Sequence, residues 1–140
     1  MNEIESLLPH REPFLFVDEI VRADEEIIIA RRRFTEDEFF FKGHFPGYPV
    51  VPGVILIETM GQSGGAGLRK MGIIEGDAMF FLAAVDKVKF RRPVRPGDEV
   101  RSEVVNLRVS PGMIKQSGKA FVGDELAAEA EWMCIIGKNT

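Results

Sequence analysis

The feature that most restricts the fold is an apolar, proline-free stretch from Val54 to Lys70. The pattern predicts one helix, about 27 Å long if residues 53–70 are all helical at about 1.5 Å per residue. It has no polar face before Arg69, and a helix that is apolar all round has to be buried. We therefore expect a long central helix that the rest of the chain encloses.

Strand-like alternation lies on both sides of this helix. Two strands are expected before it and four after it, at residues 14–23, 26–35, 78–92, 99–110, 113–122 and 126–136. Short glycine-containing turns separate the last four strands, which is typical of hairpins in an antiparallel sheet. The order of elements predicts an α+β fold in which an antiparallel sheet is wrapped around one long central helix.

Length and composition indicate a single domain over residues 1–140. A chain of this length buries roughly 68% of the surface of its unfolded form, enough for one core. Cys134 is the only cysteine, and the chain has two histidines, so neither a disulfide framework nor a Cys-rich zinc site is expected. The acidic start and the absence of an apolar run of ~20 residues predict a cytoplasmic protein without a membrane helix. The net charge of −4 disfavours nucleic-acid binding.

The predicted helix is rich in glycine, at Gly61, Gly64, Gly65 and Gly67. Each glycine is less favourable than alanine by ~1 kcal/mol in a helix interior. We expect surrounding backbone to pack closely against these positions and so explain the cost.

A rigid loop precedes the helix and carries a histidine. Residues 42–53 contain three prolines and three glycines, which exclude a long helix or a central strand. Such a loop can hold His44 in one place, and an imidazole exchanges protons near neutral pH, so His44 is a candidate general base. An ordinary surface or hydrogen-bonding role is the alternative. The other histidine, His10, is expected to bond local backbone groups.

Glu58 is an acidic residue inside the apolar helix. An ionised carboxylate there costs several kcal/mol unless it is paired. Burial favours the protonated form, which a general acid requires. Gln62 follows one turn later on the same face and is expected to orient Glu58. A salt bridge from Glu58 to a strand arginine is the structural alternative.

The first turn of the helix supplies a third chemical element. Gly53 and the residues after it present unpaired N–H groups and the positive end of the helix dipole, which can stabilise an oxyanion. A base, an acid and such donors together describe proton abstraction beside a carbonyl with expulsion of a hydroxyl. The set is more specific than any one of its members.

All three elements lie in residues 43–58, where the sequence GHFPGYPVVPGVILIE resembles the signature of the 3-hydroxyacyl-[acyl-carrier-protein] dehydratases of fatty-acid synthesis. Residues 8–18 (LPHREPFLFVD) and 86–98 (DKVKFRRPVRPGD) are similar to the same family, so the resemblance covers nearly the whole chain. It implies a hot-dog fold, in agreement with the element order. It also implies homodimers, often three to a hexamer, with active sites formed from two subunits and with no cofactor or metal.

By this resemblance, His44 removes a proton from C2 of a (3R)-3-hydroxyacyl thioester while Glu58 protonates the departing C3 hydroxyl. The Gly53 N–H would hold the thioester oxygen, and the products are a trans-2-enoyl thioester and water. The chain would then be a hydro-lyase of fatty-acid or lipid A precursor biosynthesis. The sequence leaves open the acyl chain length and whether acyl carrier protein or coenzyme A is the carrier.

The implied partner, acyl carrier protein, is acidic, so an acidic enzyme should offer it a local basic landing site. The docking candidates are Lys87, Lys89, Arg91, Arg92 and Arg95. Alternation of charge along the 87–91 stretch is equally expected of any solvated sheet face. The three arginines at residues 31–33 form a second candidate cluster.

Two other functions remain open. A hot-dog thioesterase would activate water with a carboxylate and would not need His44, so full thioester hydrolysis by an H44A variant would support it. A noncatalytic acyl-binding subunit would keep the fold and the interface but would have no use for both His44 and Glu58.

Overall fold

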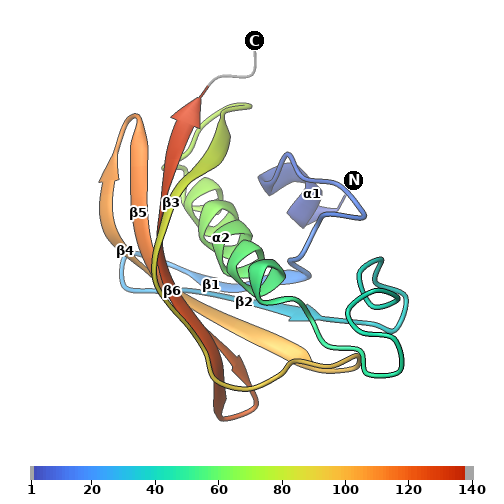
Figure 1. Ribbon diagram of the computed structural model, residues 1–140. Coiled ribbons are helices and arrows are strands. Elements are labelled where there is room, and N and C mark those ends of the chain that lie inside the picture. The colour runs from blue at the N-terminus through green and yellow to red at the C-terminus, as the bar shows by residue number, and fades with distance from the viewer. Residues whose placement is uncertain (1, 138–140) are drawn as a thin grey trace.

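The computed structural model describes residues 2–137, which form one curved antiparallel sheet around a long helix (Figure 1). The elements in chain order are α1 (Glu3–Leu7), β1 (Glu19–Ala23), β2 (Ile28–Arg33), α2 (Gly53–Lys70), β3 (Met79–Phe90), β4 (Glu99–Ser110), β5 (Met113–Val122) and β6 (Glu125–Gly137). The strand order β1-β2-β4-β5-β6-β3 leaves β1 and β3 at the two edges. The predicted α+β architecture is therefore confirmed.

The core lies between α2 and the concave face of the sheet. Met60 and Leu68 of α2 belong to the same buried cluster as Ile114 of β5 and Trp132 of β6. Burying each such side chain stabilises the fold by roughly 1.5–3 kcal/mol. None of the helices within residues 2–137 is both long and apolar enough to cross a membrane.

One side of α2 is not enclosed, contrary to the prediction of a helix buried all round. Val54 is 70% exposed, and Ile57, Glu58 and Gly61 are only partly buried. These positions recur at successive turns, so they form a single stripe along the helix. The prediction fails there because the sheet covers α2 from its concave side and no other element of the described residues covers this stripe.

The helix glycines are closely packed at three of the four positions. A Cβ added to Gly65 would lie 2.5 Å from the ring of Phe80, and one added to Gly67 would lie 2.5 Å from Ile28; Gly64 lies against the side chain of Gln116. The neighbours are side chains rather than the backbone that we expected. Gly61, on the exposed stripe, has nothing within 4 Å of an added Cβ.

Most strands begin and end within two residues of the predicted ranges, but the first is shorter. β1 begins at Glu19 rather than at Phe14, because the N–H of Phe16 donates to Gln62 Oε1 at 2.7 Å instead of to a neighbouring strand. The short helix α1 was not predicted. Its capping box joins Asn2 and Glu5 by reciprocal hydrogen bonds of 2.9 and 3.1 Å, and this Asn-x-x-Glu spacing was the signal for it.

Candidate active site

Glu58 lies in the second turn of α2, at a cavity of about 270 Å³ between the helix and strands β3 and β6. Its side chain is 25% exposed, so it is less buried than the sequence led us to expect. Gln62 Nε2 donates to Glu58 Oε2 at 3.0 Å, as the helical spacing predicts. Within residues 2–137 no arginine or lysine lies within 4 Å of this carboxylate, so the alternative of a salt bridge to a strand arginine is wrong there.

Gln62 is almost fully buried and joins Glu58 to the chain that precedes β1. Its Oε1 accepts from the N–H of Phe16 at 2.7 Å, and its Nε2 also donates to the carbonyl of Phe14 at 3.2 Å. The amide orientation is fixed by these backbone partners, because only Nε2 can donate to a carbonyl and only Oε1 can accept from an N–H. Gln62 therefore presents an N–H, not an oxygen, to Glu58.

His10 lies at the same cavity, which the sequence did not predict. Its Nε2 is 3.6 Å from Glu58 Oε2, and its Nδ1 is buried without a hydrogen-bond partner among the described residues. The expectation that His10 bonds local backbone groups is wrong. Burial lowers the pKa of His10 below its ordinary value, Glu58 opposes this shift, and the neighbouring Arg11 adds to it.

His44 is held in the loop before α2 by two contacts with Val50. Its Nδ1 lies 3.0 Å from the carbonyl of Val50, and its own carbonyl accepts from the Val50 N–H at 3.0 Å. The ring stacks on Phe45 with the centroids 4.0 Å apart. Because a carbonyl can only accept, Nδ1 carries the proton and Nε2 keeps a free lone pair. An imidazole in this tautomer can act as a base through Nε2.

Gly53 begins α2 directly after Pro52, where no side chain of residues 2–137 caps the helix. Ile55 and Leu56 donate to the carbonyl of Pro52, whereas no acceptor for the N–H groups of Gly53 and Val54 is present in the part of the chain described. Gly53 lines a cavity of about 650 Å³, and a Cβ on it would lie 2.7 Å from the ring of Phe90. The helix start thus offers unpaired donors beside an apolar cavity.

The two candidate acid–base residues do not meet within one chain. His44 and Glu58 share no hydrogen bond or ion pair, and His44 does not line the cavity of Glu58. Over residues 2–137 there is also no group of three His, Cys, Asp or Glu side chains that could hold a metal ion.

The basic residues at the end of β3 and directly after it lie opposite carboxylates of β6. Lys87 is 3.4 Å from Glu131, and Arg91 is 2.8 Å from Glu129. Lys89 is paired in register with Glu129. The positive charge predicted for docking is therefore partly balanced along this strand.

The two remaining docking candidates lie after β3. Arg92 is 3.6 Å from Asp98, and it lines the cavity that contains Gly53. Arg95 donates to the hydroxyl of Tyr48 and stacks over its ring, 4.5 Å from the centroid. Arg92 therefore borders the cavity at the helix start, and Arg95 contacts the loop that precedes the helix.

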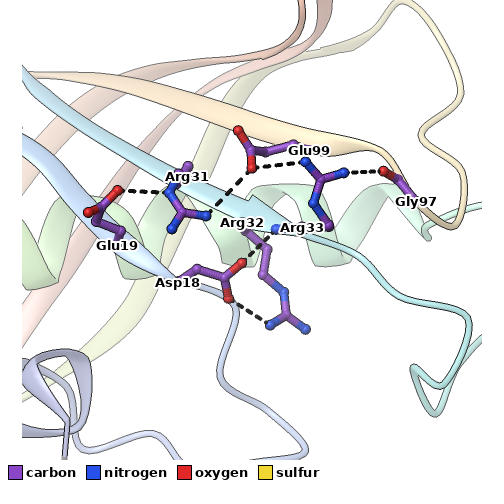
Figure 2. Close-up of polar contacts among 7 residues, drawn as sticks. All are labelled: Asp18, Glu19, Arg31, Arg32, Arg33, Gly97 and Glu99. Atoms are coloured by element: carbon purple, nitrogen blue, oxygen red, sulfur yellow. Dashed lines mark hydrogen bonds and ion pairs between the residues drawn. The ribbon is translucent and has the colours of Figure 1, made fainter.

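The arginines of β2 form a network of ion pairs, drawn in Figure 2. Arg31 contacts Glu19 at 2.8 Å and Glu99 at 3.5 Å; Arg33 contacts Glu99 at 3.3 Å. Arg32 contacts Asp18 at 3.1 Å. This second cluster proposed for docking is thus balanced by acidic residues on the adjoining strands and the segment before β1, which favours a structural role.

A six-stranded antiparallel sheet curved around one long, mostly buried helix defines the class of α+β proteins with a hot-dog fold. The FabA-like domain model matches residues 8–131. A protein of Desulforamulus reducens named "3-hydroxyacyl-[acyl-carrier-protein] dehydratase FabZ" is 46% identical over 140 residues, covering 99% of this chain and 98% of the relative. One of the same name from Coxiella burnetii is 41% identical over 140 residues, covering 98% and 99%. The chain belongs to the FabA-like family, in the branch of the 3-hydroxyacyl-[acyl-carrier-protein] dehydratases.

Solved structures support the same fold. The dehydratase heterocomplex ApeI:P of Xenorhabdus doucetiae matches with a TM-score of 0.83 at 16% identity, covering 100% of this chain and 93% of that chain. The E. coli PaaI protein of the phenylacetic acid degradation operon matches with a TM-score of 0.64 at 14% identity, covering 84% and 81%. At such identities the likeness concerns the fold alone, and it confirms the predicted hot-dog fold.

Proposed function

We propose that this chain is a hydro-lyase that removes water from (3R)-3-hydroxyacyl-[acyl-carrier-protein] to give trans-2-enoyl-[acyl-carrier-protein] in fatty-acid biosynthesis. Full-length similarity to dehydratases of that name supports the reaction. The observation that carries the proposal is how the two candidate residues are hydrogen-bonded. The contact of His44 Nδ1 with Val50 leaves a lone pair on Nε2, and Gln62 donates to Oε2 of Glu58. A cytoplasmic location goes with this function.

The proposed reaction uses three groups. His44 Nε2 takes the proton from C2, and the electron pair of that C–H bond moves into the thioester carbonyl. The resulting oxyanion accepts from the N–H groups at Gly53 and the next residue, a kind of donor worth about 3 kcal/mol. Glu58 protonates the C3 hydroxyl as the C3–O bond breaks, so that water leaves and the C2–C3 double bond forms. A positioned acid or base contributes ~10²- to 10⁴-fold.

The site requires a second copy of the chain in this proposal. Within residues 2–137, β3 pairs only with β6, so its other edge has backbone groups that no described strand pairs, and such an edge is a template for pairing. The large apolar side chains exposed on β3 are Phe81, Leu82, Val85 and Phe90. A homodimer through these edges would also cover the exposed stripe of α2 that includes Glu58. His44 of one copy would then meet Glu58 of the other, and three such dimers could build a hexamer.

The carrier is the last part of the proposal. Arg91 and Arg92 line the cavity that contains Gly53, and Arg95 lies a few residues further on. An acidic carrier protein bound there would deliver its acyl group close to the helix start. Lys87 and Lys89 would extend this basic surface along β3.

The test is enoyl formation from a panel of (3R)-3-hydroxyacyl-[acyl-carrier-protein] substrates of increasing chain length, measured by mass spectrometry. We expect the wild type to be active and both H44A and E58A to lose at least ~10²-fold in kcat while remaining folded. A folded wild type that forms no enoyl product from any chain length would contradict the proposal. Thioester hydrolysis retained by H44A would instead favour a thioesterase.

Mixing the two inactive variants tests whether the site is shared. After subunit exchange, each mixed dimer would contain one site with both substitutions and one site with neither. Since half of the dimers are mixed, we expect about a quarter of wild-type activity to return. A mixture as inactive as its components would mean that one chain supplies both residues.

A further inference from the structure

His10 is the histidine that the proposed reaction leaves unused, yet it lies beside the proposed acid. Its Nε2 is 3.6 Å from Glu58 Oε2, the same oxygen that accepts from Gln62. The ring packs against Phe80 with centroids 5.8 Å apart, and the side chain is 19% exposed. Two side chains with N–H groups thus converge on one oxygen of Glu58.

The surroundings of the His10 ring determine where its proton lies. Nδ1 is buried and has no hydrogen-bond partner among residues 2–137. A buried N–H without an acceptor is rarer in folded proteins than a buried acceptor without a donor, so the proton belongs on Nε2. Burial also lowers the pKa of His10 below its ordinary value, which favours the neutral ring. His10 therefore directs a neutral N–H toward Glu58.

The charged and titratable groups around the ring leave Glu58 as its ionisable partner. Arg11 follows in the chain, but its Nη1 donates to the carbonyls of Leu8 at 2.9 Å and His10 at 2.7 Å. Cys134 of β6 lines the same cavity, and burial, with a smaller effect of Glu58, raises its pKa to about 11, so the thiol is uncharged at pH 7. From β3 the ring meets Phe80, which carries no charge.

We propose that His10 is a positioning residue for Glu58, which it holds by donating Nε2–H to Oε2. The inference rests on the proposed dehydration. With Gln62 and His10 both on Oε2, the proton that Glu58 transfers lies on Oε1. The same two donors stabilise the carboxylate that remains once water has left. A separation of 3.6 Å is long for a hydrogen bond, but such contacts commonly shorten when the substrate is bound.

The experiment compares H10F with H10Q. Phenylalanine keeps the ring volume against Phe80 but has no donor, whereas the side-chain nitrogen of glutamine comes close to the position of Nε2. We expect H10F to lower kcat about tenfold with little change in KM, and H10Q to keep most of the activity. The alkaline limb of the kcat–pH profile should move to higher pH in H10F, because the Glu58 carboxylate has lost a donor.

Nitrogen NMR of the histidine-labelled protein gives a readout independent of turnover. The chain has two histidines, and the structure assigns them opposite tautomers, Nδ1–H for His44 and Nε2–H for His10. The signal lost in H10F, or in H10Q if H10F does not fold, belongs to His10.

Three results overturn the inference about His10: a folded H10F with kcat within twofold of wild type, an H10Q variant no more active than H10F, or an Nδ1–H tautomer for His10. The proposed function fails separately, when the wild type itself makes no enoyl product. If the wild type and H10F are equally active and E58A is inactive, the dehydration stands and only the role proposed for His10 is disproved.

Discussion

The arginines of β2 and the apolar side chains of β3 belong to one sheet but have opposite surroundings. Each arginine of β2 has acidic partners on a neighbouring strand or on the segment before β1 (Figure 2). β3 exposes apolar side chains and a free edge, beside a helix stripe that carries Glu58. Groups that are satisfied within the chain serve the fold, whereas groups left unsatisfied indicate where another molecule has to bind. The region with fewer contacts is therefore the more informative one about function.

The comparison predicts its largest effect at the free edge of β3. A lysine in place of Val85 would put a charge into the proposed interface, and we expect the dimer to dissociate and dehydration to be lost with it. Val105→Lys is the matched control, because Val105 is also exposed but lies on β4 inside the sheet. Analytical ultracentrifugation and the dehydration assay measure both. A dimeric, active V85K would disprove the interface.

The next largest effect is a loss of stability when an acidic partner of a β2 arginine is removed. Glu38 is 9% exposed and accepts from Arg32 at 2.8 and 2.7 Å, and Arg32 is itself only 16% exposed. We expect Glu38→Ala to lower the free energy of unfolding by about 2–3 kcal/mol, because it leaves a partly buried guanidinium short of a partner. The folded variant should keep its activity.

Glu99→Ala is the control for that measurement, since Glu99 is 40% exposed and its ion pairs are well solvated. Urea unfolding should rank the loss at Glu38 clearly above the loss at Glu99. Equal losses would mean that burial does not distinguish the pairs of this network.

A smaller effect is expected on the KM for carrier-protein substrates when the proposed basic docking surface loses charge. Replacing both Arg92 and Arg95 by alanine should raise KM for a carrier-protein substrate about tenfold, with kcat little changed. Arg108→Ala, an exposed arginine of β4, is the control, and a coenzyme A thioester of the same acyl chain should not respond to either change. Equal effects on the two kinds of substrate would contradict docking at this surface.

The smallest effect is on stability, and it should have opposite signs for a glycine on the exposed side of α2 and one on its enclosed side. In the monomeric Val85→Lys background, where no second chain covers the stripe of α2, Gly61→Ala should stabilise the chain by about 0.5–1 kcal/mol, since no described residue lies within 4 Å of the new methyl group and alanine favours the helix. Gly65→Ala should destabilise it, because the methyl group would lie 2.5 Å from the ring of Phe80. Thermal unfolding measures both, and a stabilising G65A would show that Phe80 can move aside.

The parts that the sequence predicted depend on contacts near in the chain. The helix, its loop and the contact of Glu58 with Gln62 follow from local pattern and helical spacing. His10 escaped prediction because its contact with Glu58 spans 48 residues, and nothing around His10 indicates where its ring will lie. The partners of the β2 arginines were equally hidden: Arg33 meets Glu99, 66 residues away. Such pairs depend on the order of strands, which local pattern does not specify.

The two hydrogen bonds that join Gln62 to the backbone of Phe14 and Phe16 connect the N-terminal segment to the candidate active site. Phe16 is fully buried in the same core cluster as Met60 of α2 and Trp132 of β6, so the segment before β1 packs as part of the core although it belongs to no strand. Packing of this segment and orientation of the Glu58 carboxyl therefore depend on each other through Gln62. A substitution that loosens the segment would disturb the carboxyl without touching either catalytic candidate.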